Sequence, residues 1–281
     1  MWVWLAVASA LLLGFYDVGK KYCLRRNGIL YVLLGITLCS VLFLSPFLQA
    51  GRWPDHLTLI AKAALVTVSW VSGLAGIKYL PLTTASTLKA SRPVLVVVLS
   101  MLIFDERLCA MQWAGVLLVF SALFMLGRSS RAEGISFVRN KGVLYMLLAI
   151  LSGAASALWD KHIIRGMAPL FIQSWTNVYI AAILLLLIAG KALFRREKPE
   201  PFRFDGMLLL TALVITASDA LYFYSLSGEG ALLSVITLVR RASVIVTFML
   251  GALLFKEHRI RDKAAALAVM LAGLVLLVLG S

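Results

Sequence analysis

Charged residues are scarce in this chain, and acidic residues are the scarcest. Only 14% of its 281 residues are charged, and 13 Asp and Glu stand against 27 Lys and Arg, for a formal net charge of +14. Soluble domains carry about 25% charged and about 45–50% apolar residues, whereas 62% of this chain is hydrophobic. The composition excludes an ordinary soluble protein and predicts a polytopic membrane protein. Most Lys and Arg lie between apolar segments, where such residues set orientation and contact anionic lipid headgroups.

Cysteine and histidine are rare as well, with three residues of each kind. Neither set has the spacing of a metal site, and an odd number of cysteines does not indicate a disulfide framework. No Walker loop, GxSxG or HExxH pattern occurs. The sequence therefore predicts no enzyme, no cofactor, no metal site and no nucleic-acid partner.

Apolar segments of roughly 17 to 25 residues, long enough to cross about 30 Å of hydrocarbon as helices, follow one another along the chain. They lie near residues 2–19, 29–49, 57–77, 82–104, 109–127, 142–161, 169–190, 206–226, 231–255 and 263–280. The connections are mostly short and carry Gly, Pro or charge, so successive helices should be antiparallel neighbours. A polar connection at residues 128–141 indicates a linker between two halves, residues 1–127 and 142–281.

The two halves share a weak internal repeat. A shift of 151 residues places Lys89 on Arg240 and Phe104 on Phe255, and a shift of 143 residues places Asp17 on Asp160. Because each half holds five helices, the second half must enter the membrane in the opposite direction, as in the inverted repeats of many secondary transporters. We predict an all-α membrane protein of ten transmembrane helices, arranged as two inverted five-helix repeats around a central cavity. Most loop Lys and Arg follow the odd-numbered helices, so the positive-inside rule places both termini outside.

Four basic residues lie too deep in the apolar segments to reach the membrane surface. They are Lys89 and Arg92 in the fourth segment and Arg240 and Arg241 in the ninth. A central Arg costs about 2.5–3.5 kcal/mol on insertion scales, so these side chains should face water, protein or an anion. Lys89 and Arg92 are three residues apart and should share one helix face, and Pro93 should kink the helix beside them. We predict that the two clusters converge on one cavity and bind an anion. A structural network of ion pairs is the alternative.

Three carboxylates within or at the end of helices are candidate partners for these cations: Asp17, Asp160 and Asp219. Asp17 and Asp160 occupy matching positions in the two halves, which favours symmetric gating or coupling groups, but helix-end caps and partners for nearby lysines are equally open. Asp219 lies deepest and is the preferred candidate for a proton carrier.

Polar and aromatic residues nearby complete the predicted binding wall. We include Thr237 before the Arg pair, Trp70 in the third segment and Tyr222 after Asp219. A hydroxyl can donate to an oxyanion, although helix packing explains such residues equally well.

Each half also ends in a similar pattern. Phe104-Asp105-Glu106-Arg107 with Gln112-Trp113-Ala114-Gly115 closes the first, and Phe255-Lys256-Glu257-His258 stands near the end of the second. With ten short helices in two repeats, the chain resembles the EamA domain of the drug/metabolite transporter superfamily over nearly its whole length. The resemblance implies a membrane transporter. Relatives carry amino acids, drugs, nucleotide sugars and phosphorylated sugars, and usually keep their termini in the cytoplasm.

A Lys on the fourth helix with a basic pair on the ninth resembles the phosphate-binding arrangement of the triose-phosphate translocators in the same superfamily. By that resemblance, Lys89 and the pair Arg240-Arg241 would clasp a phosphate or carboxylate group. The chain departs from the pattern because it has Arg-Arg rather than Lys-Arg and adds Arg92.

We therefore expect a secondary transporter of the bacterial inner membrane that works by alternating access, through exchange or proton coupling. Its partners would be a small anionic metabolite, phosphorylated ones included, and membrane lipid, and it would be a monomer or a homodimer. One alternative is an exporter of amino acids or drugs in the same fold, with its basic residues neutralised by the three aspartates. The other is a flippase for a lipid-linked substrate or a membrane scaffold that transports nothing.

Overall fold

The structure is a computed structural model. It describes residues 2–94, 109–132, 139–163, 166–195, 201–226, 236, 239–255 and 259–279. These residues form ten α-helices and one 3-10 turn, with no strand among them. The elements are α1 (Trp2–Leu24), α2 (Ile29–Leu44), the turn η1 (Ser45–Phe47), α3 (Trp53–Tyr79), α4 (Leu82–Ala90), α6 (Ala110–Ala132), α7 (Lys141–Ile163), α8 (Pro169–Arg195), α9 (Gly206–Leu226), α11 (Ser243–Phe255) and α12 (Ile260–Leu279).

Eight of the predicted segments correspond to described helices, several of which extend past the predicted ends, whereas the fourth and ninth segments are described only in part and include α4 and α11. α6 continues to Ala132, so residues 128–132 of the predicted linker are helical. The reason is that no strong helix breaker occurs there before Gly134.

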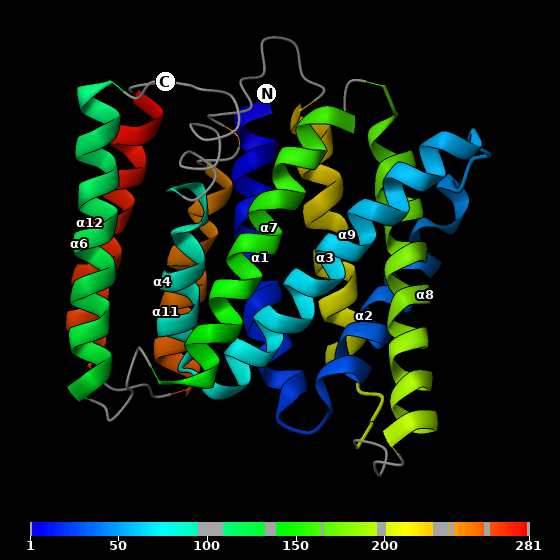
Figure 1. Ribbon diagram of the computed structural model, residues 1–281, viewed down its shortest axis with the longest axis horizontal. Helices are drawn as coiled ribbons and strands as arrows, with labels where there is room; N and C mark the ends of the chain where they lie inside the picture. The colour runs from blue at the N-terminus through cyan, green and yellow to red at the C-terminus, as the bar shows by residue number, and fades with distance from the viewer. Residues whose placement is uncertain are drawn as a thin grey trace.

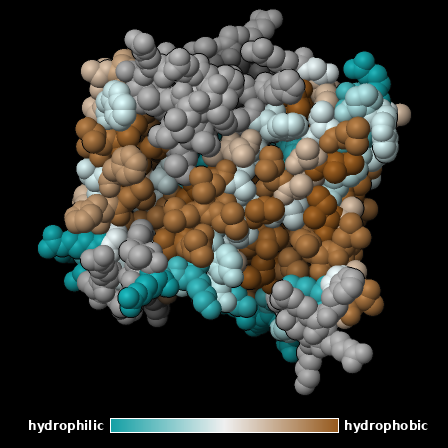
Figure 2. Space-filling view, in the orientation of Figure 1, coloured by the Kyte–Doolittle hydropathy of each residue, from teal (hydrophilic) through white to brown (hydrophobic). Residues whose placement is uncertain are grey.

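The outer surface of the helices is apolar. Phe124, Leu186 and Leu253 are 74%, 72% and 72% exposed, and Figure 2 shows a hydrophobic band across the molecule with hydrophilic residues along its lower edge. Such a continuous apolar belt fits lipid rather than water. Six of the described helices, α1, α2 with η1, α3, α6, α8 and α9, are long and apolar enough to cross a membrane. The ten spans expected from the sequence stay a prediction.

Helices from the two halves of the chain pack in exchanged pairs. α1 packs against α9 and α3 against α7, while α2 packs against α8, α4 against α11 and α6 against α12. The repeat matches α1 with α7, α2 with α8, α3 with α9, α4 with α11 and α6 with α12. Under this matching the pair α1–α9 becomes the pair α7–α3, and each of the other three pairs consists of two matched helices. In Figure 1, α1 descends from the upper edge whereas α7 ascends from the lower edge. This pairing is the one expected of an inverted repeat.

Two helices are interrupted at matching positions beside the predicted basic clusters. α4 ends at Ala90, and Ser91 N–H donates to Leu88 O at 3.0 Å while Val94 N–H donates to Ser91 O at 3.1 Å. Before α11, Ala242 N–H donates to Val239 O at 3.0 Å and Ile245 N–H to Ala242 O at 2.9 Å. Leu88, Ser91 and Val94 correspond to Val239, Ala242 and Ile245 under the same 151-residue shift that aligns Lys89 with Arg240.

Pro93 explains the first interruption, because a proline has no N–H to donate and its ring obstructs the preceding turn. The predicted kink is confirmed as a break in the helix. The second half has Val244 at the matching position, so nothing in its sequence accounts for its break. Irregular backbone at membrane depth is tolerated where it is buried in protein or lines a cavity, and both interruptions lie beside basic side chains.

The helix pair α6 and α12, at the left of Figure 1, depends on two glycines. A Cβ on Gly115 would lie 2.6 Å from Gly273 O, and a Cβ on Gly273 would lie 2.7 Å from Gly115 O. Small residues let helix backbones approach closely in membranes, so these two glycines let α6 and α12, the last helices of the two repeats, pack closely against each other.

Candidate functional site

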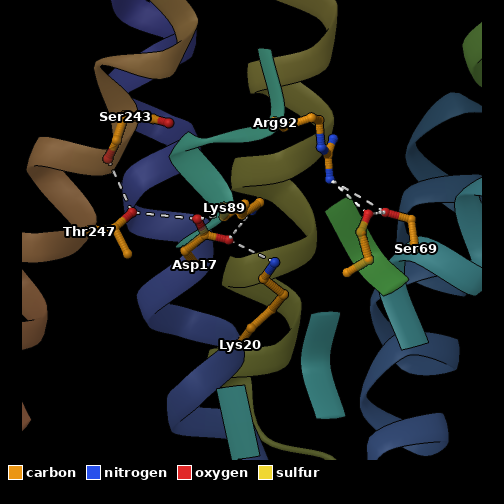
Figure 3. Close-up of polar contacts among 8 residues, drawn as sticks. Asp17, Lys20, Ser69, Lys89, Arg92, Ser243 and Thr247 are labelled. Carbon is orange, nitrogen blue, oxygen red and sulfur yellow. Dashed lines mark hydrogen bonds and ion pairs between the residues drawn. The ribbon is translucent and has the colours of Figure 1, made fainter. Parts of the chain in front are cut away.

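Asp17 lies between two lysines at the centre of the bundle. Its Oδ1 lies 2.7 Å from Lys20 Nζ and 3.1 Å from Lys89 Nζ, and Lys89 Nζ also donates to Oδ2 at 3.2 Å. The Asp17 side chain is only 5% exposed. Figure 3 shows α1 and α4 joined through this carboxylate. Of the roles left open for Asp17, the structure therefore shows a lysine partner, with one lysine on its own helix and one on the broken helix α4.

Thr247 of α11 extends this cluster to the second half of the chain. Its Oγ1 lies 3.5 Å from Asp17 Oδ2 and 3.1 Å from Ser243 O. A hydroxyl has one proton to donate, and the contact to Ser243 O is the shorter of the two. The contact places α11 beside the Asp17 carboxylate.

Arg92 points away from this cluster. Its Nη2 donates to Ser69 Oγ and to Ala149 O, both at 3.4 Å, so it bridges α3 and α7 (Figure 3). Its Nε is buried and has no hydrogen-bond partner among the described residues. Lys89 and Arg92, predicted to share one helix face, contact different partners, because α4 ends at Ala90 between them.

Arg240 pairs with Asp219. Its Nη2 donates to Asp219 Oδ1, and its guanidinium carbon lies 4.1 Å from the centre of the Tyr222 ring, a cation–π contact. Asp219 and Tyr222 are three residues apart on α9, so they face Arg240 from the same side of that helix. The Arg240 Nε is buried without a partner in the described part of the chain.

Arg241 is half-buried and lies within electrostatic range of both Arg92 and Arg240. The cations of this region are Lys20, Lys89, Arg92, Arg240 and Arg241, and the carboxylates that pair with them are Asp17 and Asp219. Among the side chains that the structure describes, Arg92 and Arg241 have no carboxylate within ion-pair distance. Two carboxylates form three ion pairs here, so among these described groups positive charge is in excess.

Two predicted site residues are not placed by the structure. Thr237 lies outside the described residues, and Asp160 is described in backbone only, within α7. Their predicted roles stay predictions. No group of three His, Cys, Asp or Glu in the described part of the chain is arranged to hold a metal ion.

A small pocket lies beside Asp219, between α2, α3, α8 and α9. It has about 10 Å³ of room, enough for about one water-sized group and far below the roughly 300–1,000 Å³ of a site for a whole small molecule. Its lining residues are Ile36, Thr37, Ser40, Trp70, Gln173, Asn177, Ile215, Thr216 and Asp219. Trp70 and Asp219 were predicted as site residues, and the structure brings both to this wall.

The sequence pointed to only some of the residues that hold this site together. Lys20 could have been found from its three-residue spacing to Asp17, and Gln173 with Asn177 from their four-residue spacing in the otherwise apolar α8. Ser69 and Thr247 carry no such signal, because they become partners of Arg92 and Asp17 only when distant helices meet.

Comparison with known proteins adds two findings. The sequence pattern described as the EamA-like transporter family matches residues 1–128 and 140–279 of the chain. A solved structure described only as "Crystal structure of protein" aligns over 100% of this chain and 99% of its own, with a TM-score of 0.68 and 17% sequence identity. At that identity the likeness shows a shared fold alone. No curated protein matches the chain in sequence.

Proposed function

Because the chain belongs to the EamA-like transporter family, and is therefore a membrane transporter of small molecules, we propose that it is a secondary active transporter of a small anionic metabolite. Phosphorylated metabolites are included in this class. We place it in a bacterial inner membrane. The proposal rests on the four deep cations, which family membership alone does not explain.

The observation that carries the proposal is the pair Arg92 and Arg241. Among the described side chains neither has a carboxylate partner, although both lie inside the bundle. Unpaired cations at membrane depth are costly and mark ion or substrate pathways. Arginine stays charged when desolvated and holds phosphate or carboxylate through two N–H groups at once. An anion that reaches these two guanidinium groups would replace the missing carboxylates.

The conformational change of alternating access would come from two repeats that cross the membrane in opposite directions. The family pattern matches two ranges, residues 1–128 and 140–279, and the exchanged helix pairs support a division into two five-helix repeats joined by a short linker. In this arrangement substrate binds between the repeats, beside the interrupted helices, and one repeat rocks against the other to alternate access.

An exporter of amino acids or drugs is the second candidate, and one observation favours it. The pairs Lys89 with Asp17 and Arg240 with Asp219 are both closed, as expected if the deep charges are neutralised within the protein. The anionic substrate is preferred because, among the side chains that the structure describes, Arg92 and Arg241 have no carboxylate partner besides these two pairs.

The test is ligand-induced stabilisation and proteoliposome exchange with a panel of organophosphates, carboxylates and amino acids. Wild-type protein should be stabilised by anions, and Arg92→Gln and Arg241→Gln should each lower the affinity about tenfold or more, since a charge-assisted hydrogen bond is worth about 1.5–3 kcal/mol. Arg128→Gln, at an exposed position of α6, is the matched control. Stabilisation by neutral amino acids in wild type and both variants alike would favour the exporter instead.

A further inference from the structure

Asp219 takes part in two features at once, the ion pair with Arg240 and the wall of the small pocket between α2, α3, α8 and α9. A second link runs along α3, where Ser69 accepts a hydrogen bond from Arg92 and the next residue, Trp70, lines the pocket. The pocket is therefore adjacent to the basic cluster on two helices.

Two hydroxyls of this pocket are left as hydrogen-bond acceptors. The Thr37 hydroxyl donates to Leu33 O at 2.7 Å and the Thr216 hydroxyl to Ala212 O at 2.9 Å. Each hydroxyl has a single proton, so only its lone pairs remain for a ligand. The carboxylate of Asp219 adds further acceptor capacity and the pocket's one negative charge.

The amide of Gln173 gives the clearest sign of a missing donor. Gln173 is only 5% exposed, and its Oε1 has no hydrogen-bond partner among the described residues. One N–H of its Nε2 donates to Thr216 O at 3.4 Å. Ser40 Oγ, also in the pocket lining, is buried without a described partner and can accept or donate. Buried polar atoms in proteins are nearly always hydrogen-bonded, so the carbonyl oxygen of the Gln173 side chain lacks a donor, which a ligand can bring.

We propose that this pocket is a second subsite, which receives a hydrogen-bond donor group, an ammonium or a hydroxyl, carried by the same small molecule whose anionic group binds Arg92 and Arg241. This inference rests on the proposed function and deepens it: the substrate has an anionic end and a donor end. A pocket with about 10 Å³ of room, enough for about one water-sized group, suits a terminal ammonium or hydroxyl rather than the whole of a small metabolite. Gln173 and Asp219 accept from the donor group, and the Arg240–Asp219 pair separates the two subsites.

The test uses three phosphate esters of equal size: propyl phosphate, 2-hydroxyethyl phosphate and 2-aminoethyl phosphate. Their affinities for the purified protein are measured by calorimetry. Wild type should bind the amino or the hydroxyl ester about tenfold more tightly than propyl phosphate. One added hydrogen bond of about 1.4 kcal/mol changes the affinity by this factor. The better of the two identifies the donor as an ammonium or a hydroxyl.

Substitutions at Gln173 then locate the preference. Gln173→Leu should abolish it while leaving the affinity for propyl phosphate unchanged, and Gln173→Glu, which keeps an acceptor and adds a negative charge, should favour the amino ester further. Gln49→Leu, at an exposed position, should leave all three affinities as in wild type. Thermal unfolding of each variant checks that it is folded.

The outcomes separate the two proposals. If no ester binds, the proposed function is wrong, and the two-ended substrate with it. If propyl phosphate binds but the donor esters gain nothing, or if their gain survives in Gln173→Leu, the second subsite is overturned while the anion site stands. Equal loss of the preference in Gln173→Leu and Gln173→Glu would also overturn it, because the acceptor would then not be the cause.

Discussion

Gly153 of α7 packs directly against the guanidinium of Arg92. A Cβ added at Gly153 would overlap the guanidinium carbon and its nitrogens. The absence of a side chain at this position is what lets Arg92 lie between α3 and α7, where it reaches Ser69 Oγ and Ala149 O.

The first prediction follows from that contact. Gly153→Ala should displace the Arg92 guanidinium and weaken anion binding about tenfold, the loss of roughly one charge-assisted hydrogen bond. Gly73→Ala is the matched control, because its Cβ would meet only Ala149 Cβ at 3.5 Å, an ordinary contact. The measurement is anion affinity by calorimetry. If both variants bind anions as wild type does, the position of Arg92 does not matter for binding.

The second prediction concerns Asp17. Asp17→Asn removes the charge that Lys20 and Lys89 share, and breaking a buried ion pair by removing one partner costs about 3–5 kcal/mol. The variant should unfold at a clearly lower temperature. Asp55→Asn breaks the largely exposed pair with Arg52, and exposed pairs contribute about 0–1 kcal/mol, so this variant should match wild type. Equal stability of both variants would show that Asp17 is not the anchor of this cluster.

The third prediction is that Asp219, the ion-pair partner of Arg240, competes with a substrate anion for this arginine. In Asp219→Asn, Arg240 is released from its ion pair, so propyl phosphate should bind more tightly while exchange in proteoliposomes slows, because the bound anion leaves less readily. Binding and exchange are measured on the same preparation. Weaker binding of propyl phosphate would mean that Asp219 only holds Arg240 in place.

The fourth prediction concerns orientation. In Figure 1 the N-terminal end of α1 and the C-terminal end of α12 lie at the same upper edge. Most loop Lys and Arg follow the odd-numbered predicted spans, and α1, the first of them, ends at the lower edge of Figure 1, so the positive-inside rule predicts termini outside the cytoplasm. A cysteine added at either terminus should react with a membrane-impermeant thiol reagent in intact cells. Protection from the reagent until the cells are opened would instead support the cytoplasmic termini usual in the family.

Much of the site could be predicted from the sequence, because a deep charge in an apolar segment is costly wherever it lies. That cost singled out Lys89, Arg92, Arg240 and Arg241, and the same cost suggested acidic partners, of which Asp17 and Asp219 are confirmed as ion-pair partners. The direction of Arg92 could not be predicted, because it depends on where α4 ends, and a proline shows only that a helix is disturbed, not which way the chain turns.

What the sequence alone determined is the class of protein, the positions of most helices, the weak repeat and the identity of the deep charges, since hydrophobicity and charge act residue by residue. What only the tertiary structure decided is how those charges are shared. Lys89 with Asp17 and Arg240 with Asp219 are each far apart in the chain, and the pocket at Gln173 is made by four helices. Partners of this kind are chosen by helix packing, which brings together residues whose spacing in the sequence carries no record of the contact.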